Sequence, residues 1–212
     1  MDITHHPSRM TNDERLDEVA RLLALGILRL RARRAKEKAP DPGQLVAELR
    51  DPDPEKSGRA RVLLLTVGEP AVPALTELLR SGTPPERILA ANTLWGMGAR
   101  ARAAVPDLVA ALEDPDLALR AASAMALENM GPAAEAAVPA LAKALGDPEP
   151  GVRQAAVKAL GAIGPGARDA LPVLTRALRR ESWPEAQEAV RRIRGLEPGA
   201  PIELGPEEPE RP

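Results

Sequence analysis

The chain has 212 residues, and its 29 Lys and Arg residues nearly balance its 31 Asp and Glu residues to give a formal net charge of −2. This balance shows no global bias toward nucleic acid or anionic membranes, and the absence of Cys excludes disulfides, thiolate zinc sites and thiol nucleophiles. Because Trp95 and Trp183 are the only aromatic residues, the core must be built from aliphatic side chains and Met.

Residues 1–10 predict a disordered tail. The adjacent His5 and His6 have no third ligand nearby in the sequence, so we expect neither a metal site nor a cofactor. The acidic start precedes no apolar core with a cleavage site, and the longest apolar stretch, 22–28, is too short to span a bilayer. These features predict a soluble, cytoplasmic protein without a membrane segment.

A long amphipathic helix is predicted over 11–38. Thr11 and Glu14 fit a capping box, and apolar residues recur at helical spacing. The acids lie at its start and the bases at its end, which matches the helix dipole. This pattern favours an N-terminal capping helix over the alternative, a basic patch from Arg29 to Lys38 for phosphate or an acidic partner.

The next part of the chain is repetitive. Four prolines, each 33 residues after the last, stand in the similar phrases AVPAL, AVPDL, AVPAL and ALPVL: Pro73, Pro106, Pro139 and Pro172. A fixed period of this size predicts a stack of identical supersecondary units. Because proline is tolerated in the first turn of a helix, each of these residues is expected to mark the start of a first helix.

A second helix is predicted after a polar break in each unit. Asp114 and Asp147 are expected to be its N-caps, with Pro115 and Pro148 at the first helical position, and Thr83 with Glu86 and Ser182 with Glu185 fit capping boxes. The second helices are expected to end where glycine takes a left-handed conformation, at Gly98, Gly131 and Gly164.

This pattern resembles the bacterial HEAT repeats of the phycobilisome-lyase-like type. The phrase VRQAAVKALGAIGPGARDALPVL at 152–174 matches their unit almost throughout, and 119–141 matches nearly as well. The resemblance implies an all-α, right-handed α-solenoid over 43–196, built of about five helix-turn-helix units that an N-terminal helix caps. It indicates a fold more than a function, because this repeat is a scaffold used in many contexts.

Five units are predicted, over 43–70, 71–103, 104–136, 137–169 and 170–196. The connecting loop of the first unit is three residues shorter than the others, because Gly68 lies five residues before Pro73. Terminal units are usually atypical, since they must cap the open apolar face of the array. Beyond them, 197–212 is rich in Pro and Glu and predicts a disordered tail.

No catalytic group is apparent in the folded region, which holds no His and no Cys. Nucleophilic catalysis normally needs an activated Ser, Cys or Lys beside a base. We therefore expect a protein that is not an enzyme. An accessory role in a bilin lyase-like enzyme stays open, because the resemblance extends to the bilin lyases. A DNA glycosylase-like groove built on Trp95 and arginines is a further alternative, against which the net acidity argues.

Arginines recur at the start of the second helices, at Arg87, Arg120 and Arg153. The ladder has two interpretations, a ligand site or a set of structural ion pairs. In repeats that these resemble, such an arginine meets an acid of the neighbouring unit, and Asp114 and Asp147 are placed to serve. We therefore expect a structural role.

The face of each second helix opposite its buried stripe is expected to line a concave binding surface. Stepping by 33, the rows expected to be exposed begin at Ile88, Ala91, Asn92 and Trp95, and they vary while the core rows do not. Trp95 is the sharpest candidate, since tryptophan is enriched at interface hot spots. The candidate partner-binding residues are Ile88, Asn92, Trp95, Met125, Glu128, Lys158, Arg191 and Arg194.

These observations predict a monomeric, non-catalytic scaffold or adaptor whose second helices hold a segment of an unidentified protein partner. The main alternative is a module that binds nucleic acid or an anion. It would use the basic end of the N-terminal helix, Arg29 to Lys38, together with Arg191, Arg192 and Arg194.

Overall fold

The computed structural model of the protein describes residues 40–180 and 183–204, and within them the chain forms ten α-helices and no strand. The predicted tail over 1–10 with its two histidines, the predicted helix over 11–38, Ser182 and the residues from 205 onward lie outside this part of the chain. The helices form five consecutive pairs: α2 (Pro42–Leu49) with α3 (Pro54–Val67), α4 (Val72–Ser81) with α5 (Pro84–Met97), α6 (Val105–Ala111) with α7 (Leu117–Met130), α8 (Val138–Ala144) with α9 (Pro150–Ile163), and α10 (Leu171–Arg180) with α11 (Pro184–Arg194). The all-α repeat fold that the sequence predicts is confirmed.

The four prolines of the 33-residue period fall at the same place in their helices. Pro73, Pro106, Pro139 and Pro172 are each the second residue of the first helix of a pair, as predicted. A 3-10 segment, rather than an irregular loop, leads into each of these helices: η2 (Glu69–Ala71), η3 (Gly98–Ala104), η4 (Gly131–Ala137) and η5 (Gly164–Ala170). Counted from the glycine that ends the second helix, the first connection spans 68–71 and the later ones have seven residues, which accounts for the three residues that the first unit lacks.

The glycines that end the second helices adopt a conformation that is hard for any other residue to reach. At Gly98, Gly131 and Gly164 φ is 55°, 56° and 71°, as expected, but ψ lies between −138° and −132° rather than in the left-handed helical region. Glycine alone enters this region without steric cost, because it has no Cβ. Gly195, after α11, is the one described helix end with the expected left-handed geometry, with φ 67° and ψ 33°.

The predicted N-caps Asp114 and Asp147 are wrong. The helix α7 begins after Asp116, whose carboxylate accepts the N–H of Ala118, and α9 begins after Glu149. Asp114 and Asp147 stand two residues earlier, where each carboxylate accepts the backbone N–H two positions ahead at 2.9 Å. They close a turn before the helix, and their second oxygens remain available to the neighbouring unit. The capping box of Thr83 and Glu86 is confirmed.

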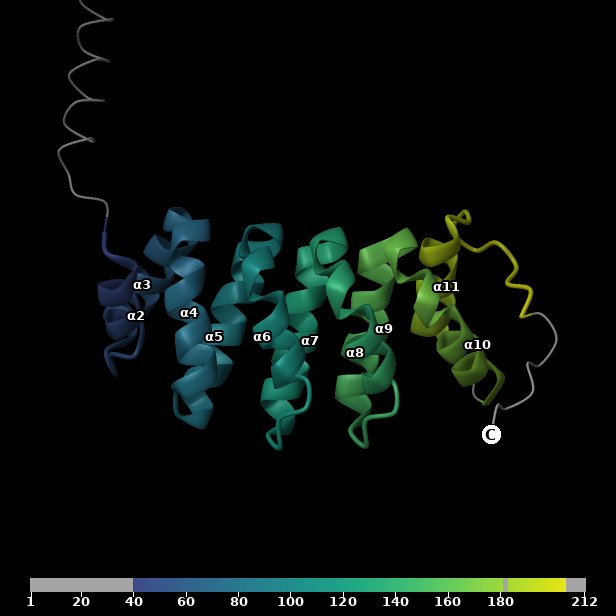
Figure 1. Ribbon diagram of the computed structural model, residues 1–212, viewed down its shortest axis with the longest axis horizontal. Coiled ribbons are helices and arrows are strands. Elements are labelled where there is room, and N and C mark those ends of the chain that lie inside the picture. The colour runs from purple at the N-terminus through teal and green to yellow at the C-terminus, as the bar shows by residue number, and fades with distance from the viewer. Residues whose placement is uncertain (1–39, 181–182, 205–212) are drawn as a thin grey trace, which may run out of the picture. The chain divides into compact units, whose positions relative to one another are not determined.

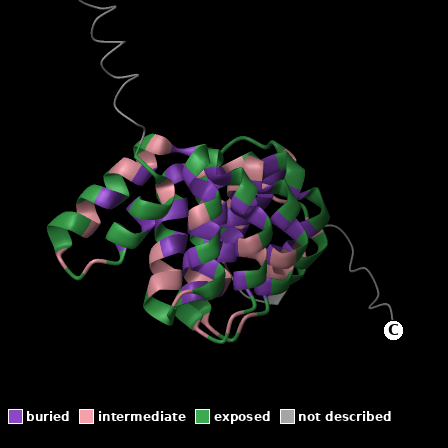
Figure 2. Ribbon diagram, turned by 60° about the vertical axis from the view of Figure 1, so that its left-hand side comes forward, coloured by how far each residue is buried: buried purple, intermediate pink, exposed green. Residues whose placement is uncertain are grey.

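The pairs stack side by side, from α2 and α3 in purple to α10 and α11 in yellow-green (Figure 1). From α3 to α11, each second helix packs against the second helix of the next pair, while the first helices pack mainly on their own partners and on the 3-10 segments. One apolar core runs through the stack (Figure 2). Its rows repeat every 33 residues, and the leucines of the first helices, Leu75, Leu108, Leu141 and Leu174, are fully buried.

The chain does not become a disordered tail at residue 197. Residues 197–204 follow a defined path across the last pair, where Ile202 packs on the apolar core. Three arginines donate to backbone oxygens of this stretch: Arg191 Nε to Ala200 at 2.9 Å, Arg194 Nη1 to Glu203 at 2.9 Å, and Arg179 Nη2 to Leu204 at 2.6 Å. This stretch, which we call the C-terminal strap, covers the outer side of the last described pair, where an array otherwise exposes its apolar face.

Candidate functional site

The arginine ladder is a structural device, as the sequence predicts. Arg87 Nη2 lies 2.7 Å from Asp114 Oδ2, and the Arg120 guanidinium binds Asp147 of the next unit through two hydrogen bonds. Arg120 also donates to the backbone oxygen of Asp114 in its own unit. Because their donors are engaged in this way, Arg87 and Arg120 tie consecutive units together and are not a ligand site.

The eight predicted site residues all lie on second helices. Ile88, Asn92 and Trp95 belong to α5, Met125 and Glu128 to α7, Lys158 to α9, and Arg191 and Arg194 to α11. The structure leaves Trp95 47% exposed and Met125 46% exposed, although both are large and apolar. Asn92 and Lys158 are exposed as well, and Ile88 and Glu128 are half-buried.

One of the rows expected to be exposed is instead part of the core. Ala91, Ala124, Val157 and Val190 are fully buried, and so is Gly161 in the row of Trp95. A Cβ on Gly161 would lie 3.1 Å from Ala189 Cα of α11, so the glycine permits a close approach of α9 and α11. The expected binding surface is therefore narrower than the sequence indicates.

Val62 of α3 was missed by the sequence analysis. It is 62% exposed and stands on the same face, in the place that Asn92 holds on α5. The signal was present in the spacing, because Gly68 precedes Gly98 by 30 residues and Val62 precedes Asn92 by the same number. Together with Trp95 and Met125, Val62 gives three consecutive second helices a large exposed apolar residue.

We call this surface the second-helix face and define it by its exposed and half-buried residues: Val62, Ile88, Asn92, Trp95, Met125, Glu128 and Lys158. The backbone beneath Trp95 is held from the next unit. Asn129 Nδ2 of α7 donates to the Trp95 backbone oxygen at 2.6 Å. The same position of the repeat, found in steps of 33 residues from Asn129, is occupied by Gly96, Ala162 and Gly195 in three other units, so none of them has Asn there. The contact fixes the end of α5 that carries Trp95.

A charged groove borders the second-helix face and shares Glu128 and Lys158 with it. Glu128, Lys158, Glu185, Glu188 and Arg192 line a groove of about 280 Å³ across α7, α9 and α11. The pKa of Glu185 is held below its ordinary value, first by a hydrogen bond from its own backbone N–H, then by one from Gln154 Nε2, and more weakly by the charge of Lys158. Glu188 is paired with Arg192.

Arg191 and Arg194 do not extend this surface. Both donate to backbone oxygens of the C-terminal strap, and Arg191 also lies 3.5 Å from Glu188. Their guanidinium groups therefore hold the chain's own segment. This placement removes them from the set of residues that face an external partner.

The described residues offer no cluster of three His, Cys, Asp or Glu side chains that could hold a metal ion. In the same part of the chain no helix is long and apolar enough to cross a membrane. The described surface therefore offers exposed apolar side chains on the second-helix face and a charged groove next to them.

Comparison with known families identifies this stack. A model described as HEAT repeats matches residues 72–137 and 105–194, which together make up more than half of the chain. The chain belongs to the HEAT repeat family. HEAT arrays mostly present an extended surface to another molecule. None of the curated protein sequences compared with this HEAT protein matches it significantly.

Solved structures of other repeat proteins have the same fold. The complex of CpcE and CpcF of phycocyanin lyase from Nostoc sp. PCC7120 contains a chain that is 21% identical, with 72% of this chain and 97% of that one covered and a TM-score of 0.58. A designed armadillo repeat protein in complex with the peptide (KR)4 is 21% identical over 71% of this chain and 79% of that one, with a TM-score of 0.52. An engineered protein is 23% identical over 72% and 77%, with a TM-score of 0.53. At these identities the likeness concerns the fold alone.

Proposed function

We propose that this HEAT protein is a non-catalytic interaction scaffold that binds a segment of a partner protein on the second-helix face. The observation that carries the proposal is the exposure of Val62, Trp95 and Met125 on three successive second helices. The other large apolar side chains on these helices pack on the core, except Leu117, which is 52% exposed at the first residue of α7. Large apolar residues gathered on one face are typical of protein interfaces.

The rigid stack suits such binding. The ladder pairs and the bond from Asn129 to the Trp95 backbone hold α5, α7 and α9 in fixed relation before any partner arrives. A preorganised surface loses little entropy on binding, so a flexible partner segment bears most of the ordering cost.

The nucleic-acid alternative has less support from the described residues. Of its three arginines in the last pair, Arg191 and Arg194 bind the strap and Arg192 pairs with Glu188. Its other half, Arg29 to Lys38, lies outside the described residues. The lyase alternative rests on a shared fold and has no tetrapyrrole-stacking aromatic cluster, since Trp95 and Trp183 are the only aromatic residues.

Selection of short random peptides on the immobilised full chain tests the proposal. Selected peptides are expected to bind wild type and to lose about tenfold or more in affinity on the double variant Trp95→Ala and Met125→Ala, as removal of hot-spot side chains does. Val173→Ala is the matched control, since Val173 is also an exposed apolar residue but lies on the first helix α10. Equal affinity for the face variant and the control would show that the binding surface lies elsewhere.

A further inference from the structure

The interface between the first and second pairs lacks the ladder ion pair that joins the second pair to the third and the third pair to the fourth. Ser57 stands where Arg87 stands one unit later, and Ser81 stands where Asp114 stands. Both hydroxyl groups bond within their own helices, Ser57 to Pro54 and Ser81 to Glu77. The arginine and carboxylate that join α5 to α7 and α7 to α9 therefore have no counterpart between α3 and α5.

The two helices diverge where this pair is missing. At their C-terminal ends α3 and α5 lie close together, because a Cβ on Gly96 would meet Leu65 Cδ2 at 3.0 Å. At their N-terminal ends a cleft of about 460 Å³ separates them. Leu89 contributes to the gap, since alanine holds its place on α7 and α9, at Ala122 and Ala155.

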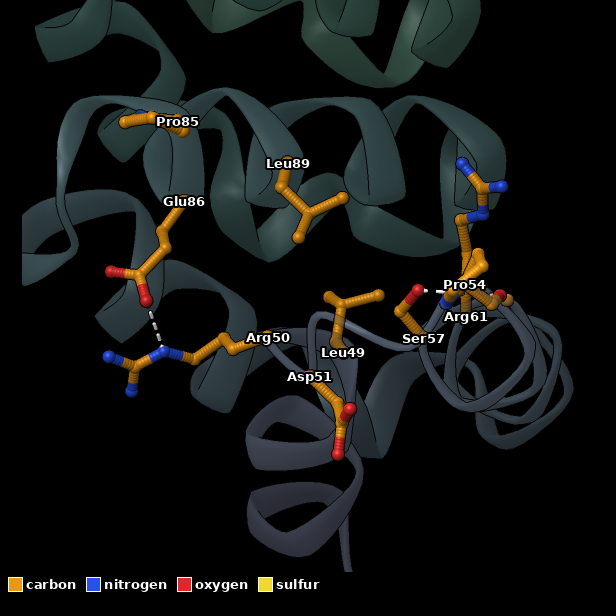
Figure 3. Close-up of a pocket in the computed structure, with 10 residues that line it drawn as sticks. Leu49, Arg50, Asp51, Pro54, Ser57, Arg61, Pro85, Glu86 and Leu89 are labelled. Atoms are coloured by element: carbon orange, nitrogen blue, oxygen red, sulfur yellow. Dashed lines mark hydrogen bonds and ion pairs between the residues drawn. The ribbon is translucent and has the colours of Figure 1, made fainter.

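The middle of the cleft is lined by two leucines, and charged residues lie at its two ends. Figure 3 shows Leu49 and Leu89 facing one another across it, with the ion pair of Arg50 and Glu86 on one side and Arg61 on the other. Pockets of this size and lining are suited to holding an apolar group with a few polar contacts that orient it.

Arg61 gives the cleft an uncompensated positive charge. Among the lining residues Arg50 is paired with Glu86, and Asp51 is paired with Lys56 at 3.2 Å. The Arg61 side chain is exposed and has no hydrogen bond or ion pair with any other residue that the structure describes. The complement of this cleft is therefore an apolar side chain next to a carboxylate.

We propose that the cleft between α3 and α5 binds a large apolar side chain of a partner peptide, and that Arg61 binds an acidic residue beside it. The inference rests on the proposed function, because Gly58 and Arg61 line the cleft while Val62, the next residue of α3, belongs to the second-helix face. A peptide segment that crosses α3, α5 and α7 on this face passes the mouth of the cleft. The partner is thus an acidic, apolar segment.

The peptides selected on wild type should carry an Asp or Glu beside a large apolar residue. Arg61→Glu should weaken their binding about tenfold, and replacing the peptide's acid by Lys should restore binding to this variant, since close charge pairs across interfaces are strongly coupled. Arg59→Glu is the matched control, because it makes the same charge change two residues away on an exposed position that does not line the cleft.

A second variant tests the cleft itself. Ser57→Arg with Ser81→Asp rebuilds the missing ladder pair, closes the N-terminal ends of α3 and α5, and should abolish binding in fluorescence anisotropy titrations. Selected peptides without an acid, or equal affinities for the Arg61 and Arg59 variants, overturn this inference. If binding of those peptides is still weakened by Trp95→Ala with Met125→Ala, the proposed function holds although the inference about the cleft fails. If they depend on neither, or if no peptide is selected, both fail.

Discussion

The Arg120 guanidinium and the Asp147 carboxylate form a two-bonded ion pair between successive units, with Nε to Oδ2 at 2.8 Å and Nη2 to Oδ1 at 3.0 Å. The same carboxylate accepts the backbone N–H of Glu149. A single aspartate thus shapes the turn before α9 and fastens that turn to α7. Only 12% of the Arg120 side chain and 9% of the Asp147 side chain are exposed.

Asp147→Ala should destabilise the array. The change leaves the largely covered Arg120 guanidinium without its partner and removes the turn contact to Glu149, so the thermal midpoint should fall by about 5 °C. Circular dichroism melts measure the shift. Asp107→Ala is the control, because its partner Arg80 has a side chain that is 61% exposed, and ion pairs at the surface contribute little. Equal shifts for the two variants would refute the role assigned to the ladder.

The same pair predicts how stability depends on pH. The hydrogen bond from Arg120, followed by that from the Glu149 N–H, lowers the pKa of Asp147 below its ordinary value of 3.8. A depressed pKa in the folded state gives stability that is present above pH 3.8 and is lost as the pH falls through the folded value. Denaturant titrations in this acidic range should show a steeper loss for wild type than for Asp147→Asn. Parallel curves for the two proteins would contradict the prediction.

Two glycines of α9 should respond in opposite ways to alanine. Gly161→Ala places a Cβ 3.1 Å from Ala189 Cα and should cost about 1–3 kcal/mol of unfolding free energy through overpacking. Gly151→Ala has open space around its Cβ and should stabilise the helix by about 0.5–1 kcal/mol. Urea titrations of both variants measure the difference. A neutral Gly161→Ala would mean that α9 and α11 do not need this close contact.

Deletion of 197–212 should loosen the last pair. Without the strap, Arg179, Arg191 and Arg194 lose backbone acceptors and the core loses Ile202, so α10 and α11 should exchange their amide hydrogens faster. Deletion of 205–212 alone is the control and should leave the protection of these helices unchanged. Unaltered exchange after the longer deletion would show that the strap does not cap the array.

Most of the fold was accessible from the sequence because its signals are local. The prolines fix φ in the first turn, and the glycines supply a backbone conformation that other residues avoid, so the helix boundaries near Pro106 and Gly131 follow from nearest-neighbour chemistry. The prediction that Asp114 and Asp147 are N-caps was wrong because a local signal alone allows two structures there. An Asp before Pro fits both an N-cap and a preceding turn, and a contact with an arginine about one repeat away accompanies the second role at Asp114 and Asp147.

The face and the strap depended on contacts that local patterns do not reveal. A second helix in a stack touches three neighbours, namely its own first helix and the second helices on both sides, so Ala91 and Val157 are buried although an amphipathic pattern places them outside. The strap is poor in core-forming residues. It is held by arginines that bind its backbone oxygens, and composition does not record such acceptors.

The main claim is that residues breaking the repeat on the second-helix face form the binding site, while the repeated residues hold the fold. The most direct test measures the affinity of a selected peptide for Trp95→Ala, with the thermal midpoint recorded on the same sample. We predict an affinity about tenfold or more below wild type at an unchanged midpoint, because Trp95 is a large side chain that is 47% exposed. An unchanged affinity, or a loss of binding that only follows a loss of folding, would contradict the claim.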